Sequence, residues 1–144
     1  MGARIIKNNQ EYKQTDAEYE LYSDFATSFL PNPFNKQLSR KTNESSVAQA
    51  LRNLLLTNKY ERRRNPRFGS TITSYLFEPF TPTVLDEIDN RVRNTIENHE
   101  PRVRILDLKV STNQTEDELV IDLRFATVTA PEPEKLTVTL YRVR

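Results

Sequence analysis

Apolar residues recur at helical spacing in two stretches of the chain and alternate with polar residues in its last third. The first stretch predicts a helix that begins near Asn43 or Glu44 and ends by Asn58, with Thr42, Asn43 or Ser45 as its N-cap. The second begins at Thr81-Pro82, a hydroxyl cap followed by proline at the first helical position, and stops before Pro101. Their apolar faces are Val47, Ala50, Leu51, Leu54 and Leu55, then Leu85, Ile88, Val92 and Ile96.

Three strands are predicted after the second helix, over residues 103–110, 119–125 and 136–140. Strict alternation of apolar and polar positions in the second and third strands indicates that one face of the sheet is buried. Between the two helices, Gly69 is expected in a backbone conformation that other residues resist, and a short helical piece ends at Pro79. Helices followed by consecutive strands predict an α+β fold, in which the helices pack on a small three-stranded antiparallel sheet.

The N-terminal residues are expected to form an extended arm. Residues 1–20 are polar, and 10–22 have the pattern of a marginal helix. Two prolines then predict an extended strap whose residues Phe25, Phe29 and Phe34 lie across the domain or on a partner. We therefore predict an arm and strap over 1–34 and a domain over 35–144.

Composition excludes several classes of function. The chain has 144 residues and a net charge of +1, which argues against a nucleic-acid partner. Mean hydropathy is −0.70, and no apolar run approaches the ~18 residues of a membrane span, so no membrane partner is expected. The lack of cysteine removes disulfides and thiolate metal sites and is consistent with assembly in a reducing cytoplasm. A basic loop from Lys59 to Arg67 is either a docking surface or a solvated loop.

No residue pattern predicts catalysis, a cofactor or a metal site. Glycoside hydrolysis needs two carboxyl groups across one bond, and nothing pairs the candidates Glu78, Glu97, Glu100 and Asp107. His99 is the only histidine and has no companion ligands at metal-binding spacing. The favoured interpretation is therefore that the chain is not an enzyme.

Four short motifs occur in a characteristic order. They are Asn65-Pro66-Arg67-Phe68-Gly69, Leu76-Phe77-Glu78, Thr81-Pro82, and Asn98-His99-Glu100-Pro101-Arg102. In this order and spacing, from about Ser46 to Val110, the chain resembles the small wedge subunit of contractile-tail phage baseplates. That family is often labelled "lysozyme-like" and includes the TssE component of type VI secretion baseplates.

The resemblance implies a structural role in a virion tail baseplate that is assembled in the bacterial cytoplasm. Glu100, Pro101 and Arg102, at what we expect to be an exposed helix end, would contact helices of the large baseplate wedge protein. From the residues alone, the favoured interpretation of the motif is a helix stop in which Arg102 pairs with a nearby acid, and it is the resemblance that favours the partner contact.

The family also resembles the strand-exchanging domain of the tail sheath. The edge of the last strand, at Thr137, Val138, Thr139 and Leu140, would then receive a strand of the sheath protein. Arg142 and Arg144 are expected to guard that edge in part. Other baseplate and tail-tube proteins are further expected partners. The alternatives are a type VI secretion component, a peptidoglycan-cleaving lysozyme and a free-standing regulatory binding module.

Overall fold

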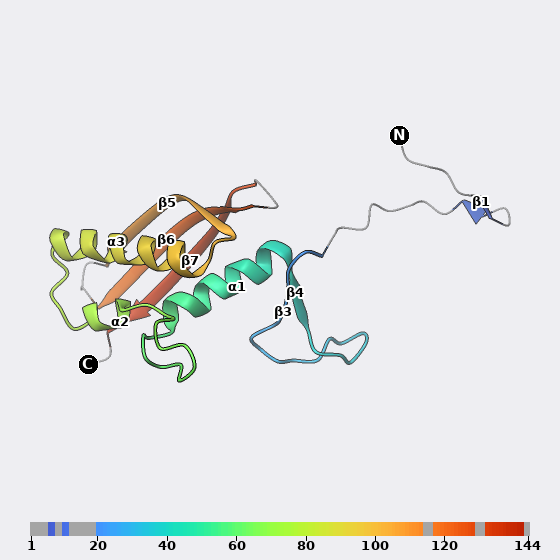
Figure 1. Cartoon of the computed structure of the whole chain (residues 1–144), viewed down its shortest axis with the longest axis horizontal. Coiled ribbons are helices and arrows are strands. Elements are labelled where there is room, and N and C mark those ends of the chain that lie inside the picture. The colour runs from blue at the N-terminus through green and yellow to red at the C-terminus, as the bar shows by residue number, and fades with distance from the viewer. Residues whose placement is uncertain (1–5, 8–9, 12–19, 114–116, 129–131, 143–144) are drawn as a thin grey trace.

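Three C-terminal strands form an antiparallel sheet in the order β5-β6-β7, with the helices packed against it (Figure 1). The computed structural model describes residues 6–7, 10–11, 20–113, 117–128 and 132–142. The strands are β5 (Val103–Thr112), β6 (Glu118–Thr127) and β7 (Glu134–Tyr141). Helix α1 (Asn43–Leu56) packs against β7 and α3 (Pro82–His99) against β5, with the short α2 (Ile72–Tyr75) between the helices in sequence. The predicted α+β fold is confirmed.

The core lies between the helices and the inner face of β6. Every second residue of β6 is buried there, and each of these side chains is fully excluded from solvent: Leu119, Ile121, Leu123 and Phe125. The helices contribute Val47 and Leu51 from α1 and Ile88, Val92 and Ile96 from α3, all equally buried. Burying one such side chain contributes roughly 1.5–3 kcal/mol, so the alternation seen in the sequence is what holds the layers together.

The two long helices begin in different ways. At α3 the side chain of Thr81 accepts a hydrogen bond from the Val84 N–H at 3.4 Å, as the Thr-Pro signal predicts. At α1 the N-cap residue is Thr42, but its side chain makes no capping bond. Asn43 instead accepts from the Leu21 N–H at 3.0 Å, which ties the start of α1 to the segment before β3.

A β-bulge interrupts the edge strand β5. Ile105 pairs with Phe125 and Asp107 with Arg124, so Leu106 is an extra residue with no partner on β6. Its side chain is exposed. A bulge bends and twists its strand and breaks the regular ladder at that point.

The N-terminal segments differ from the predictions. Two short antiparallel pairs are present: β1 (Ile6–Lys7) with β2 (Gln10–Glu11), and β3 (Ser23–Phe25) with β4 (Arg40–Thr42). The marginal helix over 10–22 is wrong at both of its described ends, since Gln10 and Glu11 form a strand and residues 20–22 are not helical; residues 12–19 lie outside the described part.

The strap does not lie across the domain. It forms a hairpin with β4 that leads away from the sheet (Figure 1), and the side chains of Phe25, Phe29 and Phe34 are exposed. Local hydrogen bonds close this hairpin, which the two prolines did not reveal. The arm at 1–34 and the domain at 35–144 stay a prediction.

Candidate interaction surfaces

The turn between α3 and β5 is built from Glu100, Pro101 and Arg102. The Glu100 N–H donates to the Ile96 carbonyl at 2.8 Å and closes the helix, while the Glu100 carbonyl accepts from the Val103 N–H at 3.2 Å and starts the strand. Glu100 itself has φ −131° and ψ 74°, outside the helical region. Proline at the next position disfavours helical geometry, so the chain turns where the sequence predicts.

Glu100 and Arg102 are bonded to each other rather than presented freely. Arg102 donates from Nε to Oε1 of Glu100 at 2.5 Å and from a terminal nitrogen to Oε2 at 2.7 Å. Glu100 is buried, with 7% of its surface exposed, whereas the Arg102 side chain is 35% exposed. The expectation that both lie at an exposed helix end is therefore wrong for Glu100. A buried carboxylate needs such a bidentate partner, and the hydrogen bonds to Glu100 also raise the pKa of Arg102.

Segments distant in sequence surround this turn. The Arg102 guanidinium lies 5.0 Å from the ring centre of Tyr22, just before β3. On the other side, the rings of His99 and Phe68 are 5.5 Å apart, and Arg62 from the basic loop lies 4.2 Å over Phe68. The Pro-x-Phe-Gly motif thus brings the basic loop to the end of α3. The sequence did not indicate that Tyr22 belongs to this site, because its contact with Arg102 depends on the placement of the segment just before β3.

A small cavity lies at this junction. Its volume is about 210 Å³, and the segments that line it are the β3–β4 hairpin, α1, the basic loop and the end of α3. The lining residues are Asp24, Ala50, Asn53, Leu54, Arg62, Phe68, His99 and Glu100. The Glu100-Pro101-Arg102 turn is consequently one wall of a surface assembled from four parts of the chain. We call this surface the α3–β5 corner.

The outer edge of β7 has no strand beside it among the described residues. The Arg142 N–H donates to the Asp117 carbonyl of the β6 side at 2.8 Å. In an antiparallel ladder this direction alternates, so Leu140 and Val138 also point their N–H groups at β6. The N–H and carbonyl groups of Thr137 and Thr139 therefore face the open edge. Of the four residues predicted for strand addition, two direct their backbone groups at the open edge and two direct them at β6.

Arg142 does not guard the open edge, contrary to expectation. Its guanidinium donates to the backbone carbonyls of Leu76 and Glu78 and lies 5.0 Å from the ring centre of Phe80. It thus satisfies carbonyl groups of the segment that follows α2. Arg144 lies outside the described residues.

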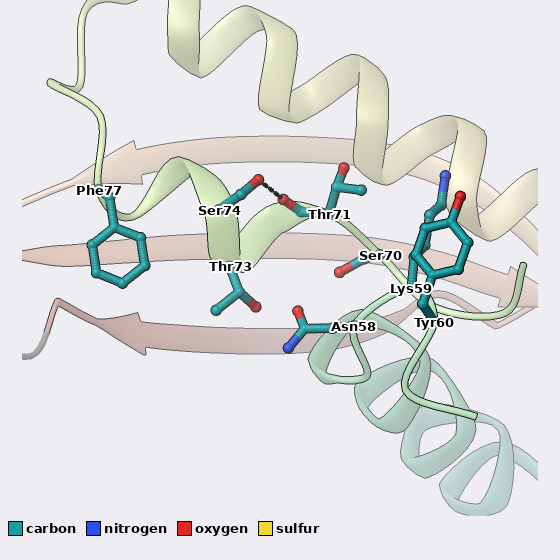
Figure 2. A pocket seen from close by; sticks show the side chains of 8 residues that line it. All are labelled: Asn58, Lys59, Tyr60, Ser70, Thr71, Thr73, Ser74 and Phe77. Carbon is teal, nitrogen blue, oxygen red and sulfur yellow. Dashed lines mark hydrogen bonds between the residues drawn. The ribbon is translucent and has the colours of Figure 1, made fainter. Parts of the chain in front are cut away.

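A shallow pocket opens between the end of α1 and α2 (Figure 2). Its volume is about 380 Å³, and its lining residues are Asn58, Lys59, Tyr60, Ser70, Thr71, Thr73, Ser74 and Phe77. The Ser70 N–H donates to the Thr57 carbonyl at 2.8 Å, which closes the loop that forms one wall. No acidic residue lines the pocket, so it lacks the carboxyl pair that sugar hydrolysis needs.

The described residues contain no cluster of three or more His, Asp or Glu side chains that could bind a metal. Nor does any described helix have the length and apolarity of a membrane span. Of the acids weighed as catalysts, Glu100 is occupied by Arg102 and Asp107 lies 4.0 Å from Lys109. The surfaces that stand out in this small α+β protein are the α3–β5 corner, the open edge of β7 and the β3–β4 hairpin.

The model of the family described as "Baseplate wedge protein gp25" matches residues 41–132. The match covers more than half of the chain, which therefore belongs to this family of contractile-tail baseplate components. Among curated proteins, baseplate wedge protein gp25 of Enterobacteria phage T4 is 28% identical over 113 residues, covering 78% of this chain and 85% of that protein.

Solved structures share the fold. A putative tail lysozyme from Geobacter sulfurreducens is 27% identical with a TM-score of 0.63, covering 68% of this chain and 89% of its own. A chain of the anti-feeding prophage baseplate is 21% identical with a TM-score of 0.59, and the match covers 85% of this chain and 87% of that one. A chain of the type VI secretion baseplate complex is 18% identical with a TM-score of 0.58, and the match covers 69% of this chain and 93% of that one. At these lower identities the last two show the fold alone.

Proposed function

We propose that this baseplate wedge protein binds the large wedge protein of its tail through the α3–β5 corner. The observation that carries this is the Arg102–Glu100 pair, in which Glu100 is buried and held on both oxygens while the side chain of Arg102 is about a third exposed. The fork of Arg102 has donors beyond the two that Glu100 uses. A partner carbonyl or carboxylate at the corner would meet a donor whose position is already set, which lowers the entropy cost of binding.

The test is reconstitution of the wedge with the large wedge protein. Arg102→Lys keeps a cation beside buried Glu100 but loses the planar fork, so we expect the domain to stay folded and wedge formation to fall roughly tenfold or more. Arg93→Lys is the matched control, because Arg93 pairs with Asp89 on α3, one turn apart, at 3.4 Å. Normal wedge formation by the Arg102 variant would contradict the assignment.

The open edge of β7 is the proposed starting point for the tail sheath. Thr137 and Thr139 direct backbone groups outward, and main-chain bonds to an added strand would supply affinity while the alternating side chains set the register. Threonine and valine are strong strand formers, which suits an edge that pairs with another chain.

The role is structural, in our interpretation, rather than enzymatic. The T4 relative is a baseplate wedge protein, and the carboxylate at the corner is bonded on both oxygens by Arg102. A lysozyme function is the competing interpretation, since a similar solved structure bears the name putative tail lysozyme. Assembly would take place in the bacterial cytoplasm, with other baseplate and tail-tube proteins as further partners and neither nucleic acid nor membrane involved. No cofactor or metal is part of the proposal.

A further inference from the structure

The β3–β4 hairpin, residues 23–42, exposes a group of large apolar side chains. Phe34 is 95% exposed, and four others in the segment are each about half exposed or more: Phe25, Phe29, Leu30 and Leu38. Single exposed apolar residues are ordinary, but five within 14 positions of one hairpin form a patch of the kind that marks an interaction site.

The hairpin is closed by hydrogen bonds of its own backbone. The Ala26 N–H donates to the Ser39 carbonyl at 2.9 Å and the Ser39 N–H to the Leu30 carbonyl at 3.2 Å. At the tip, the Asn32 N–H donates to the Gln37 carbonyl at 2.7 Å. Phe29 is held at φ 49°, a conformation that bulky side chains rarely adopt and that tends to occur at binding sites.

The base of the hairpin is fixed to α1 by one buried side chain. Gln49 donates to the Phe25 carbonyl at 2.7 Å and to Oδ2 of Asp24 at 3.2 Å, and it accepts from the Thr27 N–H at 3.3 Å. The side-chain amide of Gln49 therefore both donates and accepts hydrogen bonds. The hairpin is consequently held in position by the domain while its tip stands in solvent (Figure 1).

Charge indicates the kind of partner. The hairpin includes the cations Lys36, Arg40 and Lys41 and one acid, Asp24, whose carboxylate accepts hydrogen bonds from Gln49 and from the Phe25 N–H. Arg40 is occupied in part, by Ser23 Oγ and by Glu20 at 3.8 Å. Lys36 and Lys41 remain for a partner with carboxylates, and three cations are few for anchoring to a lipid surface.

We propose that this hairpin docks on an acidic, apolar segment of another baseplate protein. Apolar side chains of the partner cover Phe29, Leu30 and Phe34, and its carboxylates lie beside Lys36 and Lys41. This rests on the chain's membership of a baseplate, not on the role of the α3–β5 corner.

A photo-cross-linker in assembled tails identifies the partner directly. Phe34→benzoylphenylalanine is compared with Phe77→benzoylphenylalanine, at a phenylalanine of similar exposure beside α2. We expect position 34 to cross-link to a different protein, at a segment with both apolar and acidic residues. Cross-links to a second copy of this chain, to lipid, to a segment without acids, or to nothing would overturn the proposal.

Two double variants test the energetics in the same particles. Phe29→Ser with Phe34→Ser removes the apolar patch, and Lys36→Glu with Lys41→Glu reverses the charge, with Phe77→Ser as control. Because the side chains lie in solvent, we expect the melting temperature to change little and the amount of protein retained in tails to drop roughly tenfold. Full retention of both variants would refute hairpin docking. If Arg102→Lys is retained while the hairpin variants are lost, the corner proposal fails and this one stands.

Discussion

Arg102 holds both carboxylate oxygens of Glu100, a residue only two positions earlier in the chain. The proline between them fixes the turn, and the stacking of Arg102 on Tyr22 steadies the guanidinium. The motif therefore has a structural part, the buried carboxylate of Glu100 with its two hydrogen bonds, and a part open to solvent, the partly exposed side chain of Arg102. The sequence left two interpretations of Glu-Pro-Arg open, a helix stop with an internal ion pair and a contact with the large wedge protein. One site can serve both.

Removing Arg102 is expected to destabilise the domain, because it leaves a buried carboxylate without a partner. For Arg102→Ala we expect a loss of about 1–2 kcal/mol, less than for a fully buried pair since Arg102 is a third exposed. Urea unfolding of the purified domain measures this. The double variant Glu100→Gln with Arg102→Ala should recover part of the lost stability, because the amide carries no charge. A double variant less stable than Arg102→Ala would contradict the explanation that an unpaired buried carboxylate causes the loss.

Gly69 is expected to tolerate no side chain. Its φ is 110°, and a Cβ there would lie 2.5 Å from the Thr57 carbonyl oxygen. Gly69→Ala should therefore cost more than about 2 kcal/mol, because both backbone strain and a clash with main-chain atoms oppose it. Thermal unfolding compares it with Ser74→Ala, a change in the next helix that removes one hydroxyl. Equal melting temperatures of the two variants would show that the backbone around Gly69 shifts to accept the added methyl group, contrary to the prediction.

Proline substitutions along β7 should alternate in effect. At Thr137 and Thr139 the N–H faces the open edge, so proline removes a donor that only a partner strand would use. The domain should fold while sheath assembly on the baseplate fails. At Val138 and Leu140 the N–H faces β6, and proline there breaks the internal ladder.

Circular dichroism and sheath-length measurement separate the two outcomes. We expect unfolding for Val138→Pro and Leu140→Pro, and folded but inactive protein for Thr137→Pro and Thr139→Pro. Normal sheath on either folded outer-edge variant would rule out strand addition at this edge. Sheath attachment would then have to come from side chains elsewhere, first of all the basic loop.

The pKa of Asp122 should respond to a change on the neighbouring strand. Thr137 donates to Oδ1 of Asp122 at 2.5 Å, and this hydrogen bond, with Lys135 nearby, holds the pKa of the carboxyl below its usual value. A lowered pKa stabilises the fold above the ordinary value of about 4, and this contribution is lost as pH falls through the lowered pKa. Thr137→Val should move the pKa upward, as NMR titration would record. An unchanged pKa would mean that Lys135 alone sets it.

Purified protein should release no reducing sugar from peptidoglycan between about pH 4 and 7, the range in which a tuned carboxyl pair operates. The reason is that the buried acid at the corner is already bonded to Arg102, and no acid lines the pocket beside α2. A reducing-sugar assay with a known lysozyme as positive control tests this. Activity in the wild type that disappears in Glu100→Gln or Glu78→Gln would make the protein an enzyme.

The long helices and the three C-terminal strands could be predicted from the sequence because each is determined locally. Period-two alternation at Leu119, Ile121, Leu123 and Phe125 allows only one face to be buried, and Thr81-Pro82 with Pro101 sets both ends of α3. The turn at Gly69 was equally local. In all these places propensity and tertiary packing favour the same structure.

The corner and the hairpin depended on contacts between distant segments. That Glu100 is buried follows from Tyr22, Asn53 and Phe68 closing around the end of α3, which no spacing reveals. Arg142 was expected to guard the edge of the last strand, but the backbone that follows α2 lies within its reach. The three phenylalanines of the hairpin were expected to be covered by the domain or by a partner. The hairpin is instead closed by backbone hydrogen bonds, such as Ala26 N–H to the Ser39 carbonyl, and such bonds leave no pattern of side-chain types in the sequence.

The bulge at Leu106 makes the two outer strands of the sheet different from each other. The edge of β5 is bent at the extra residue and packs beneath α3, whereas β7 pairs with β6 residue for residue over its whole length. Only one side of the sheet is thus a regular template. Under the proposed strand addition, a chain would extend this sheet from β7, where the ladder is regular, rather than from the bulged β5, and an assembly begun in this way would have a defined polarity from its first subunit.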